Sequence, residues 1–292
     1  MIVTGGLYKA YTNSNTAAAS IDGGISWCSL PDLPDFRYDH TQSGPVLCGG
    51  GFKDATEKSC LTFKGGVWNY THNLRYKRYA HSVWASPKGI LLIGSNYGVG
   101  INSTEILKED GHTTESFDLE YNIFGACVIQ LSDEMIVTGG LYSFSDVQAY
   151  SNDGKLQTKL PSLKNGRHGH SCGHYINSEN ELVYLVVGGT DRPLNHLVSL
   201  ASTEILINGE EFWKDVGKLS RGTIDMKAVS LDNKIIITGG RDETETNPND
   251  KSVFSFNIIS NQWEHIGDMI QGRYSHAMSV VPVEDVADYC QP

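Results

Sequence analysis

The chain has 292 residues with 23 lysines and arginines against 34 aspartates and glutamates, so its formal net charge is −11. This acidic balance, without a basic stripe, argues against a nucleic acid or an anionic membrane surface as the partner. No apolar run approaches the roughly 18 residues that a membrane helix needs, so membrane insertion is not expected.

A short phrase recurs along the chain from its first residue. MIVTGGLY stands at residues 1–8 and again at 135–142, and related apolar runs closed by small residues read PVLCGG (45–50), ILLIGS (90–95), YLVVGG (184–189) and IIITGG (235–240). The first glycines of the six phrases lie 44, 45, 45, 49 and 51 residues apart. Such a nearly constant period predicts an array of one repeated structural unit.

Each unit is predicted to contain four strands. The apolar run is short and rich in valine and isoleucine, which indicates a buried strand, and the paired glycines end it where no side chain fits. A further strand follows an Arg-x-x-His sequence in four units, at Arg37/His40, Arg78/His81, Arg167/His170 and Arg273/His276. The third strand reads STEIL at 103–107 and 202–206. The fourth carries Trp27, Trp68, Trp213 or Trp263, each seven residues after an equivalent position, as a hairpin imposes.

These features resemble kelch repeats, and the resemblance covers the whole chain in six copies. It implies an all-β fold, a six-bladed β-propeller of four-stranded antiparallel blades. The chain begins inside an apolar run and ends with RYSHAMSVVPV at 273–283. The C-terminal strand is therefore expected to pair with the N-terminal strand and close the ring. Residues 1–292 then form a single domain.

The six cysteines suggest three disulfides. Two lie at equivalent places in the innermost strands of adjacent units, two are opposed across a predicted hairpin, and the last lies far enough beyond the final strand to reach the first. These candidate pairs are Cys127 with Cys172, Cys48 with Cys60, and Cys28 with Cys290. Six cysteines allow 15 pairings, and six reduced cysteines in a cytosolic protein are the alternative.

An even number of cysteines with geometric partners favours an oxidising compartment, so we expect a secreted, extracellular protein. Two glycosylation acceptors agree with this location, Asn69 in Asn-Tyr-Thr and Asn102 in Asn-Ser-Thr.

Two motifs suggest particular chemistry. His168, His170 and His174 have the density of a metal site, but His170 is the repeat histidine, so a structural role is favoured and no metal or cofactor is expected. SIDGGISW at residues 20–27 matches the Asp-box pattern of sialidases. In that family the box is a turn remote from the catalytic face, and an aspartate with a left-handed glycine suits such a turn.

Binding is expected on one face of the ring. The loops after the glycine pairs and the segments before the repeat arginines emerge on the same face, which we call the loop face, and they are rich in tyrosine and arginine. Packing of the central funnel is the alternative role for these side chains. The candidate ligand-binding residues are Tyr8, Tyr11, Arg37, Tyr38, Phe52, Tyr76, Arg78, Tyr79, Tyr97, Tyr142, Phe144, Arg167, His168, Arg192, His196, Arg241 and Tyr274.

The first functional hypothesis is a non-catalytic extracellular binding module for a protein or carbohydrate ligand, similar to secreted kelch-like proteins of invertebrates. The runner-up is a carbohydrate-active enzyme of the galactose oxidase or sialidase type. The sequence shows no match to the copper ligands of the former, and the latter would need an arginine cluster at the axis. A third hypothesis, an intracellular kelch adaptor, would be expected to include a BTB or similar domain, and the 292 residues contain none.

Overall fold

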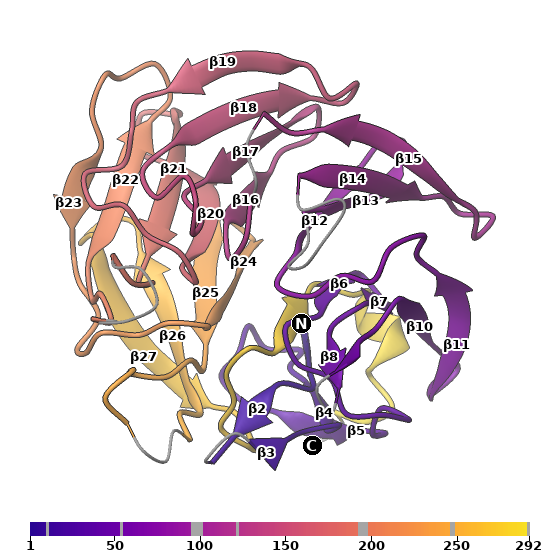
Figure 1. The fold of residues 1–292 in the computed structure, drawn as a ribbon. Helices are drawn as coiled ribbons and strands as arrows, with labels where there is room; N and C mark the ends of the chain where they lie inside the picture. The colour runs from indigo at the N-terminus through magenta and orange to yellow at the C-terminus, as the bar shows by residue number, and fades with distance from the viewer. Residues whose placement is uncertain are drawn as a thin grey trace.

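Six antiparallel sheets surround a common axis in the computed structural model (Figure 1). The structure describes residues 1–9, 12–52, 55–94, 102–120, 123–191, 198–245 and 249–290. Within these ranges each of the six large sheets has four strands, and the one helical element is the 3-10 helix η1 (Val283–Asp285). No helix in these ranges is long and apolar enough to cross a bilayer. The predicted all-β, six-bladed propeller is confirmed.

The blades are numbered 1 to 6 in chain order, and the strands of each run outward from the axis. The innermost strands are β28 (Ala277–Ser279), β6 (Thr41–Ser43), β12 (Ser82–Ser86), β16 (Cys127–Gln130), β20 (Ser171–Ile176) and β24 (Lys227–Leu231). The second strands are β1 (Ile2–Thr4), β7 (Val46–Cys48), β13 (Gly89–Ile93), β17 (Glu134–Thr138), β21 (Leu182–Val187) and β25 (Lys234–Thr238). The third strands are β4 (Ala17–Ala19), β10 (Ser59–Lys64), β14 (Ser103–Leu107), β18 (Val147–Ser151), β22 (Thr203–Ile207) and β26 (Ser252–Asn257). The outermost strands are β5 (Cys28–Leu30), β11 (Val67–Asn73), β15 (Thr113–Asp118), β19 (Leu156–Leu160), β23 (Lys214–Val216) and β27 (Gln262–Asp268). Two small hairpins stand on the loop face, β2 (Leu7–Tyr8) with β3 (Thr12–Asn13) and β8 (Gly51–Phe52) with β9 (Ala55–Thr56).

The second strands are apolar throughout because each blade packs against a neighbour on both faces. In β21 every residue from Val183 to Val187 is buried, with no alternation between an apolar and a polar face. The apolar layers therefore lie between blades. One such layer combines Leu185 of blade 5 with Ile235 and Phe256 of blade 6.

The paired glycines dock each blade onto the next one. At Gly5, where φ is 55°, a Cβ atom would lie 2.5 Å from the carbonyl oxygen of Arg37 and 2.8 Å from the ring of His40. The amide of Gly6 donates to that same carbonyl of Arg37 at 2.7 Å. Equivalent bonds of 2.8–2.9 Å join Gly50 to Arg78, Gly140 to Arg167, Gly189 to Thr223 and Gly240 to Arg273. Only glycine permits this approach, since it accepts a positive φ and carries no Cβ.

The repeat arginines are buried inside their own blades. The guanidinium of Arg167 donates to the carbonyl of Ser202 at 3.2 Å and forms an ion pair with the fully buried carboxylate of Glu204. Arg78 forms the corresponding ion pair with Glu105 at 2.6 Å. The STEIL phrase therefore appears twice because its serine and glutamate accept the hydrogen bonds of a buried arginine.

The repeat histidines join neighbouring blades through a threonine hydroxyl. Each Nε2 lies 2.8–2.9 Å from the Oγ1 atom of a threonine in the preceding blade, in the pairs His40–Thr4, His81–Thr41, His170–Thr138 and His276–Thr238. Burial, assisted by the adjacent arginine, lowers the pKa of His81 to about 3 and the pKa of the other three well below 6.5. The four rings are therefore neutral structural groups near pH 7.

Three of the four outer tryptophans donate a hydrogen bond to the preceding blade, and Trp263 does so to the hydroxyl of Thr203 at 2.8 Å. The indole Nε1 of Trp68 donates to Pro31 at 3.0 Å, and that of Trp213 donates to Pro161 at 2.7 Å. Trp27 instead bonds within its own hairpin. Tryptophan therefore recurs at this position of the repeat because it joins the outer edges of adjacent blades.

The Asp box forms the hairpin turn that its sequence predicts. The carboxylate of Asp22 accepts from the amides of Ile25 and Ser26 at 3.0–3.1 Å, and Gly23 and Gly24 have φ values of 77° and 97°. The turn lies between β4 and β5 and carries no group of the axial site described below.

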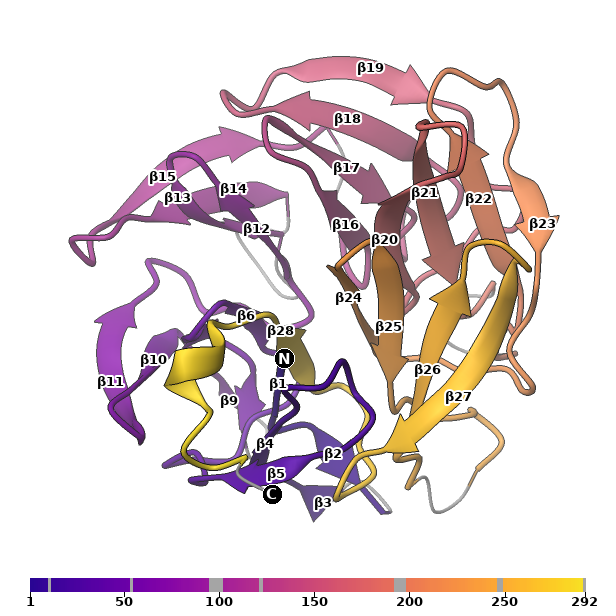
Figure 2. The ribbon, with the colours of Figure 1, turned by 180° about the vertical axis from the view of Figure 1, so that it is seen from behind.

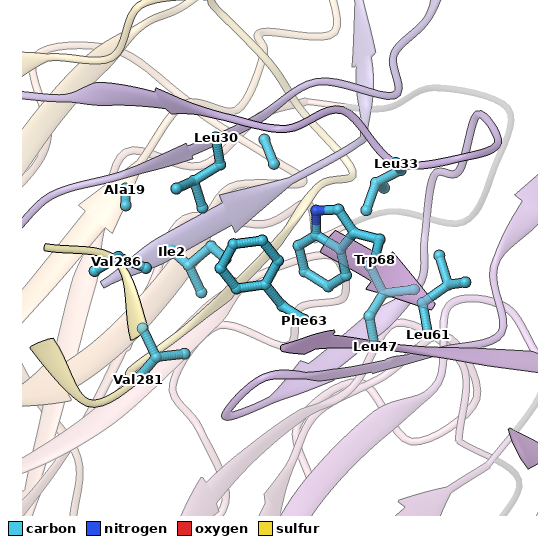
Figure 3. Packing of buried hydrophobic residues seen from close by; sticks show 11 residues of the cluster. Ile2, Ala19, Leu30, Leu33, Leu47, Leu61, Phe63, Trp68, Val281 and Val286 are labelled. Atoms are coloured by element: carbon cyan, nitrogen blue, oxygen red, sulfur yellow. The ribbon is translucent and has the colours of Figure 1, made fainter. Parts of the chain in front are cut away.

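The C-terminal strand closes the ring as predicted. Strand β28 pairs antiparallel with β1, with Met278 opposite Val3. Beyond it, Val281 and Val286 pack beside Phe63 in the apolar layer between blades 1 and 2 (Figure 3). In Figure 2 the tail and η1 lie beside the outer strands of blade 2. The tail thus covers an interface between blades in addition to completing a sheet.

All six cysteines are in disulfides, in the pairs that the sequence suggested. The Cα–Cα separations are 5.2 Å for Cys28–Cys290, 4.1 Å for Cys48–Cys60 and 5.9 Å for Cys127–Cys172. The first bond ties the tail to an outer strand of blade 1. The third joins the innermost strands of blades 4 and 5. Two of the three bonds therefore hold together parts of the ring that are not neighbours within one hairpin.

Replacing Glu204 by glutamine should destabilise the protein by about 3–5 kcal/mol, because it leaves the buried guanidinium of Arg167 without its counter-charge. Urea unfolding at pH 7.5 with intact disulfides measures this difference. The matched control is Glu211→Gln, since Glu211 is exposed in the same blade and should tolerate the change within about 0.5 kcal/mol. Equal stability of the two variants would contradict the structural role of the ion pair.

Candidate functional site

A cavity of about 600 Å³ runs along the axis of the ring and is lined by all six innermost strands. The residue two positions before each of these strands has a positive φ, and its amide donates to the carbonyl of the equivalent residue in the preceding blade. The six donor–acceptor pairs are Asp39 to Ser275, Ala80 to Asp39, Gly125 to Ala80, Gly169 to Gly125, Asp225 to Gly169 and Ser275 to Asp225, at 2.7–3.4 Å. The hydrogen bonds form a closed ring at the loop-face end of the cavity.

This backbone ring has two chemically different halves. Blades 3, 4 and 5 contribute Ala80, Gly125 and Gly169, which bring no functional side chain. Blades 6, 1 and 2 contribute two carboxyl groups and a hydroxyl group. We call the group made by Asp39, Asp225, Arg241, Glu243 and Ser275 the polar arc; all five line the axial cavity.

Arg241 organises one end of the polar arc. Its guanidinium lies 2.8 Å from the carboxylate of Glu243 and 3.3 Å from that of Asp225, and its Cζ stands 5.1 Å from the centre of the Tyr274 ring. A β-bridge between Arg241 and Ile224 fixes the backbone at this point. The ionic contacts and the stacking on an aromatic ring hold the guanidinium in one orientation.

Asp39 is the least compensated carboxyl group of the arc. Burial, together with repulsion from Asp225, raises the pKa of Asp39 to about 6, although Lys227, Arg241 and a hydrogen bond with Ser275 act in the opposite direction. The site therefore holds more negative charge than its cations neutralise.

Lys227 places a second cation near the axis. Its charge contributes to the lowered pKa of four buried histidines that belong to four different blades. Only a position close to the axis brings one ammonium group within reach of all four.

Two further polar groups adjoin the arc on blade 5. His168 and Thr190 form a β-bridge and line the cavity, and both are buried. Among the described residues, neither His168 Nδ1 nor Thr190 Oγ1 has a hydrogen-bond partner. The phenyl ring of Phe144 packs edge-on against the imidazole of His168, with 5.9 Å between the ring centres. Both atoms are almost completely inaccessible, so each leaves an unsatisfied polar group in the wall of the cavity, which costs free energy.

Three of the predicted ligand-binding residues prove to be internal. The side chains of Arg37, Arg78 and Arg167 are 0% exposed and bond carbonyl groups of their own blades. The expectation that they contact a ligand is therefore corrected: each donor that could reach a ligand is turned toward the blade interior. The four repeat arginines likewise form no cluster at the axis, as a sialidase site would require.

The predicted aromatic residues differ in their exposure. Tyr142 is 63% exposed on the loop face, whereas Tyr274 is 1% exposed beneath Arg241. The half-buried members are Tyr8, Tyr38, Tyr76, Tyr79 and Phe144. Tyr11, Tyr97, Arg192 and His196 lie outside the described residues, as does the side chain of Phe52.

The three clustered histidines do not converge. His170 bonds Thr138 between blades 4 and 5, His168 lies at the loop-face end of the cavity, and His174 stands near the opposite end of β20. Within the described ranges no group of three histidine, cysteine or carboxylate side chains is placed to hold a metal ion.

The sequence analysis missed most of the polar arc. It selected Arg241, but not Asp39, Asp225, Glu243 or Ser275. A signal was nevertheless present, because the residue before each repeat histidine is always glycine, aspartate, serine or alanine, a set enriched in residues that accept a left-handed conformation.

These observations define a propeller with a polar mouth at one end of its axis, and such a propeller is in general a binding or scaffold module. A family model described as the Kelch motif matches residues 224–270, which span blade 6. The solved structure of YjhT has a similar fold, with a TM-score of 0.73 over 90% of this chain and 96% of that chain, at 13% identity. The chain is a six-bladed β-propeller with a kelch motif in blade 6. No curated protein matches its sequence at a significant level.

Replacing Asp39 by asparagine should stabilise the protein by about 1–3 kcal/mol at pH 7.5. The pKa of Asp39 in the folded protein lies above its ordinary value of 3.8, so the stability associated with this group is complete below pH 3.8 and is lost as the pH rises through about 6. Asparagine also tolerates the φ of 52° at this position.

Urea unfolding of Asp39→Asn and the wild type at pH 7.5 and pH 4 tests this prediction, and the gain should nearly vanish at the lower pH. Asp133→Asn, on an exposed carboxylate at the opposite face, is the control and should change neither value. A loss of stability in Asp39→Asn at pH 7.5 would refute the prediction.

Proposed function

We propose that the protein is an extracellular, non-catalytic binding module that engages its ligand on the loop face, around the mouth of the axial cavity. The observation that carries this proposal is the set of hydrogen-bonding and charged groups that the fold gathers there without using them fully. Asp39, Asp225 and Glu243 line the cavity together with the cations Arg241 and Lys227, and the pKa of Asp39 is raised to about 6 by burial and by Asp225. A ligand that bonds these groups would recover free energy that the unliganded protein lacks.

The rim of this mouth suits recognition of a large ligand. Tyr142 is mostly exposed, while Tyr76, Tyr79 and Phe124 are half-buried. Tyr79 and Phe124 support each other edge-to-face, with 6.2 Å between ring centres. Rings held rigidly in this way lose little conformational entropy on binding, which favours their use as contact residues.

The three disulfides support the extracellular location. They use every cysteine of the chain, and one of them ties the C-terminal tail to blade 1. Such bonds persist in oxidising compartments and are rare in the cytosol, where thiols are kept reduced. Three disulfides are therefore not expected in a cytosolic adaptor. Mass spectrometry of the protein without reduction tests this argument: a mass lower than that of the reduced chain by six hydrogen atoms, two per disulfide, is expected, and six free thiols would overturn it.

Binding should depend on the loop face and be indifferent to the opposite face. We would screen a printed glycan array and a library of secreted protein domains, and then compare Tyr142→Ala with Ile176→Ala. Both side chains are exposed apolar groups, but Ile176 ends β20 at the opposite face. Tyr142→Ala should weaken binding of the selected ligand about tenfold, and Ile176→Ala should leave it unchanged.

Unchanged binding in Tyr142→Ala together with weakened binding in Ile176→Ala would refute the proposal. Turnover of galactose or of a fluorogenic sialoside by the purified protein would identify an enzyme in place of a binding module.

Of the two glycosylation acceptors, Asn69 should be occupied when the protein passes through a secretory pathway and Asn102 should not. Asn69 is exposed on the outer strand β11, whereas the Asn102 amide donates to the carbonyl of Leu119 at 3.1 Å and is half-buried. Intact mass after secretion from a eukaryotic host measures this occupancy. Asn69→Gln should remove one glycan and Asn102→Gln should remove none; the opposite pattern would show that Asn102 is the accessible site.

A further inference from the structure

The polar arc carries an excess of negative charge that the protein does not neutralise. It contains three carboxyl groups, on Asp39, Asp225 and Glu243, and one guanidinium, on Arg241, with Lys227 as the next nearest cation. Three acids against two bases leave one negative charge uncompensated when all are ionised. The net charge of −11 over the whole chain acts in the same direction.

The arrangement of the carboxylates indicates which kind of cation this site can bind. Among the described residues the three carboxylates do not converge on one point as metal ligands would, so the site suits a cation with several separated donors better than a metal ion. Ammonium and guanidinium groups have three and five donors and bind carboxylates through directed hydrogen bonds.

The other half of the mouth suits an aliphatic stem. Ala80, Gly125 and Gly169 add no polar side chain to the backbone ring, and Phe124 lines the cavity on this side. A slim hydrocarbon chain can therefore lie against the bare half and Phe124 while its charged end meets the polar arc. Lysine and arginine side chains combine these two properties.

We propose that the axial mouth receives one cationic side chain, a lysine or an arginine, of a partner protein, with its charge between Asp39 and Asp225 and its stem against Phe124. This inference rests on the proposed function, because it names the chemistry of the ligand that the loop face binds. This inference predicts that the ligand is a protein with a protruding basic residue and not a glycan.

The binding test uses n-butylammonium and n-butylguanidinium as probes for the two side chains, with butyrate as the anionic control, titrated into the full-length protein and followed by NMR. The two cations should shift signals of residues at the axial mouth, and butyrate should not. A pentapeptide with a central lysine should bind at least as tightly as butylammonium. Failure of the peptide while the free amine binds would overturn the assignment to a protein side chain.

The variant Asp39→Asn should weaken binding of butylammonium at least tenfold, and Asp133→Asn at the opposite face should not change it. The first variant is expected to be more stable than the wild type, so lost binding would not reflect unfolding. Binding should also weaken about tenfold between pH 7.5 and pH 5, as Asp39 takes up a proton in the presence of Asp225, Lys227, Arg241, Glu243 and His168.

Three results would overturn the inference: butyrate binding as tightly as the cations, wild-type affinity in Asp39→Asn, or calcium displacing the amine. The proposed function would survive any of them if Tyr142→Ala still weakened binding of a ligand found on the arrays. If that ligand instead depended on the opposite face, the proposed function would fail whether or not an amine enters the cavity.

Discussion

The structure depends on one contact that is repeated around the ring: the glycine pair that ends a second strand lies directly beneath the Arg-x-x-His turn of the next blade. A Cβ atom on Gly5 would enter both the carbonyl of Arg37 and the ring of His40, so the two blades would have to separate. Because each blade packs on both sides, a disturbance at one joint affects the apolar layers next to it. The phrase therefore recurs in the sequence wherever one blade meets another.

Closure turns these joints into a continuous structure. Strand β28 completes the sheet of β1, and the Cys28–Cys290 bond holds the tail that follows it against blade 1. The hydrogen-bonded ring around the axis links all six blades by backbone groups alone. A rigid frame of this kind holds side chains at its mouth in defined positions, and such preorganisation lowers the entropic cost of binding.

The candidate site arises where the blades differ from one another. The four repeat arginines and the four repeat histidines are buried and make the same contacts in each blade that contains them. They therefore cannot distinguish one ligand from another. The positions just before the repeat histidines, and the equivalent positions in blades 4 and 6, lie at the axis and vary in side chain, with Asp39 and Asp225 on one half of the ring and Gly125 and Gly169 on the other. This asymmetry within a symmetric frame gives the mouth a charged side and a bare side.

The sequence by itself determined the number of blades, the strand order and the closing strand, because each follows from the period of the repeat; it suggested the cysteine pairs but left other pairings open. It could not separate Arg37, which is buried, from Arg241, which lines the cavity, since both follow or precede similar phrases. Only the tertiary structure decided this, because burial depends on which carbonyl groups of distant strands surround a side chain. The axial mouth was likewise decided by tertiary structure: Asp39, Asp225 and Ser275 are more than 45 residues apart in sequence and meet only when the ring closes.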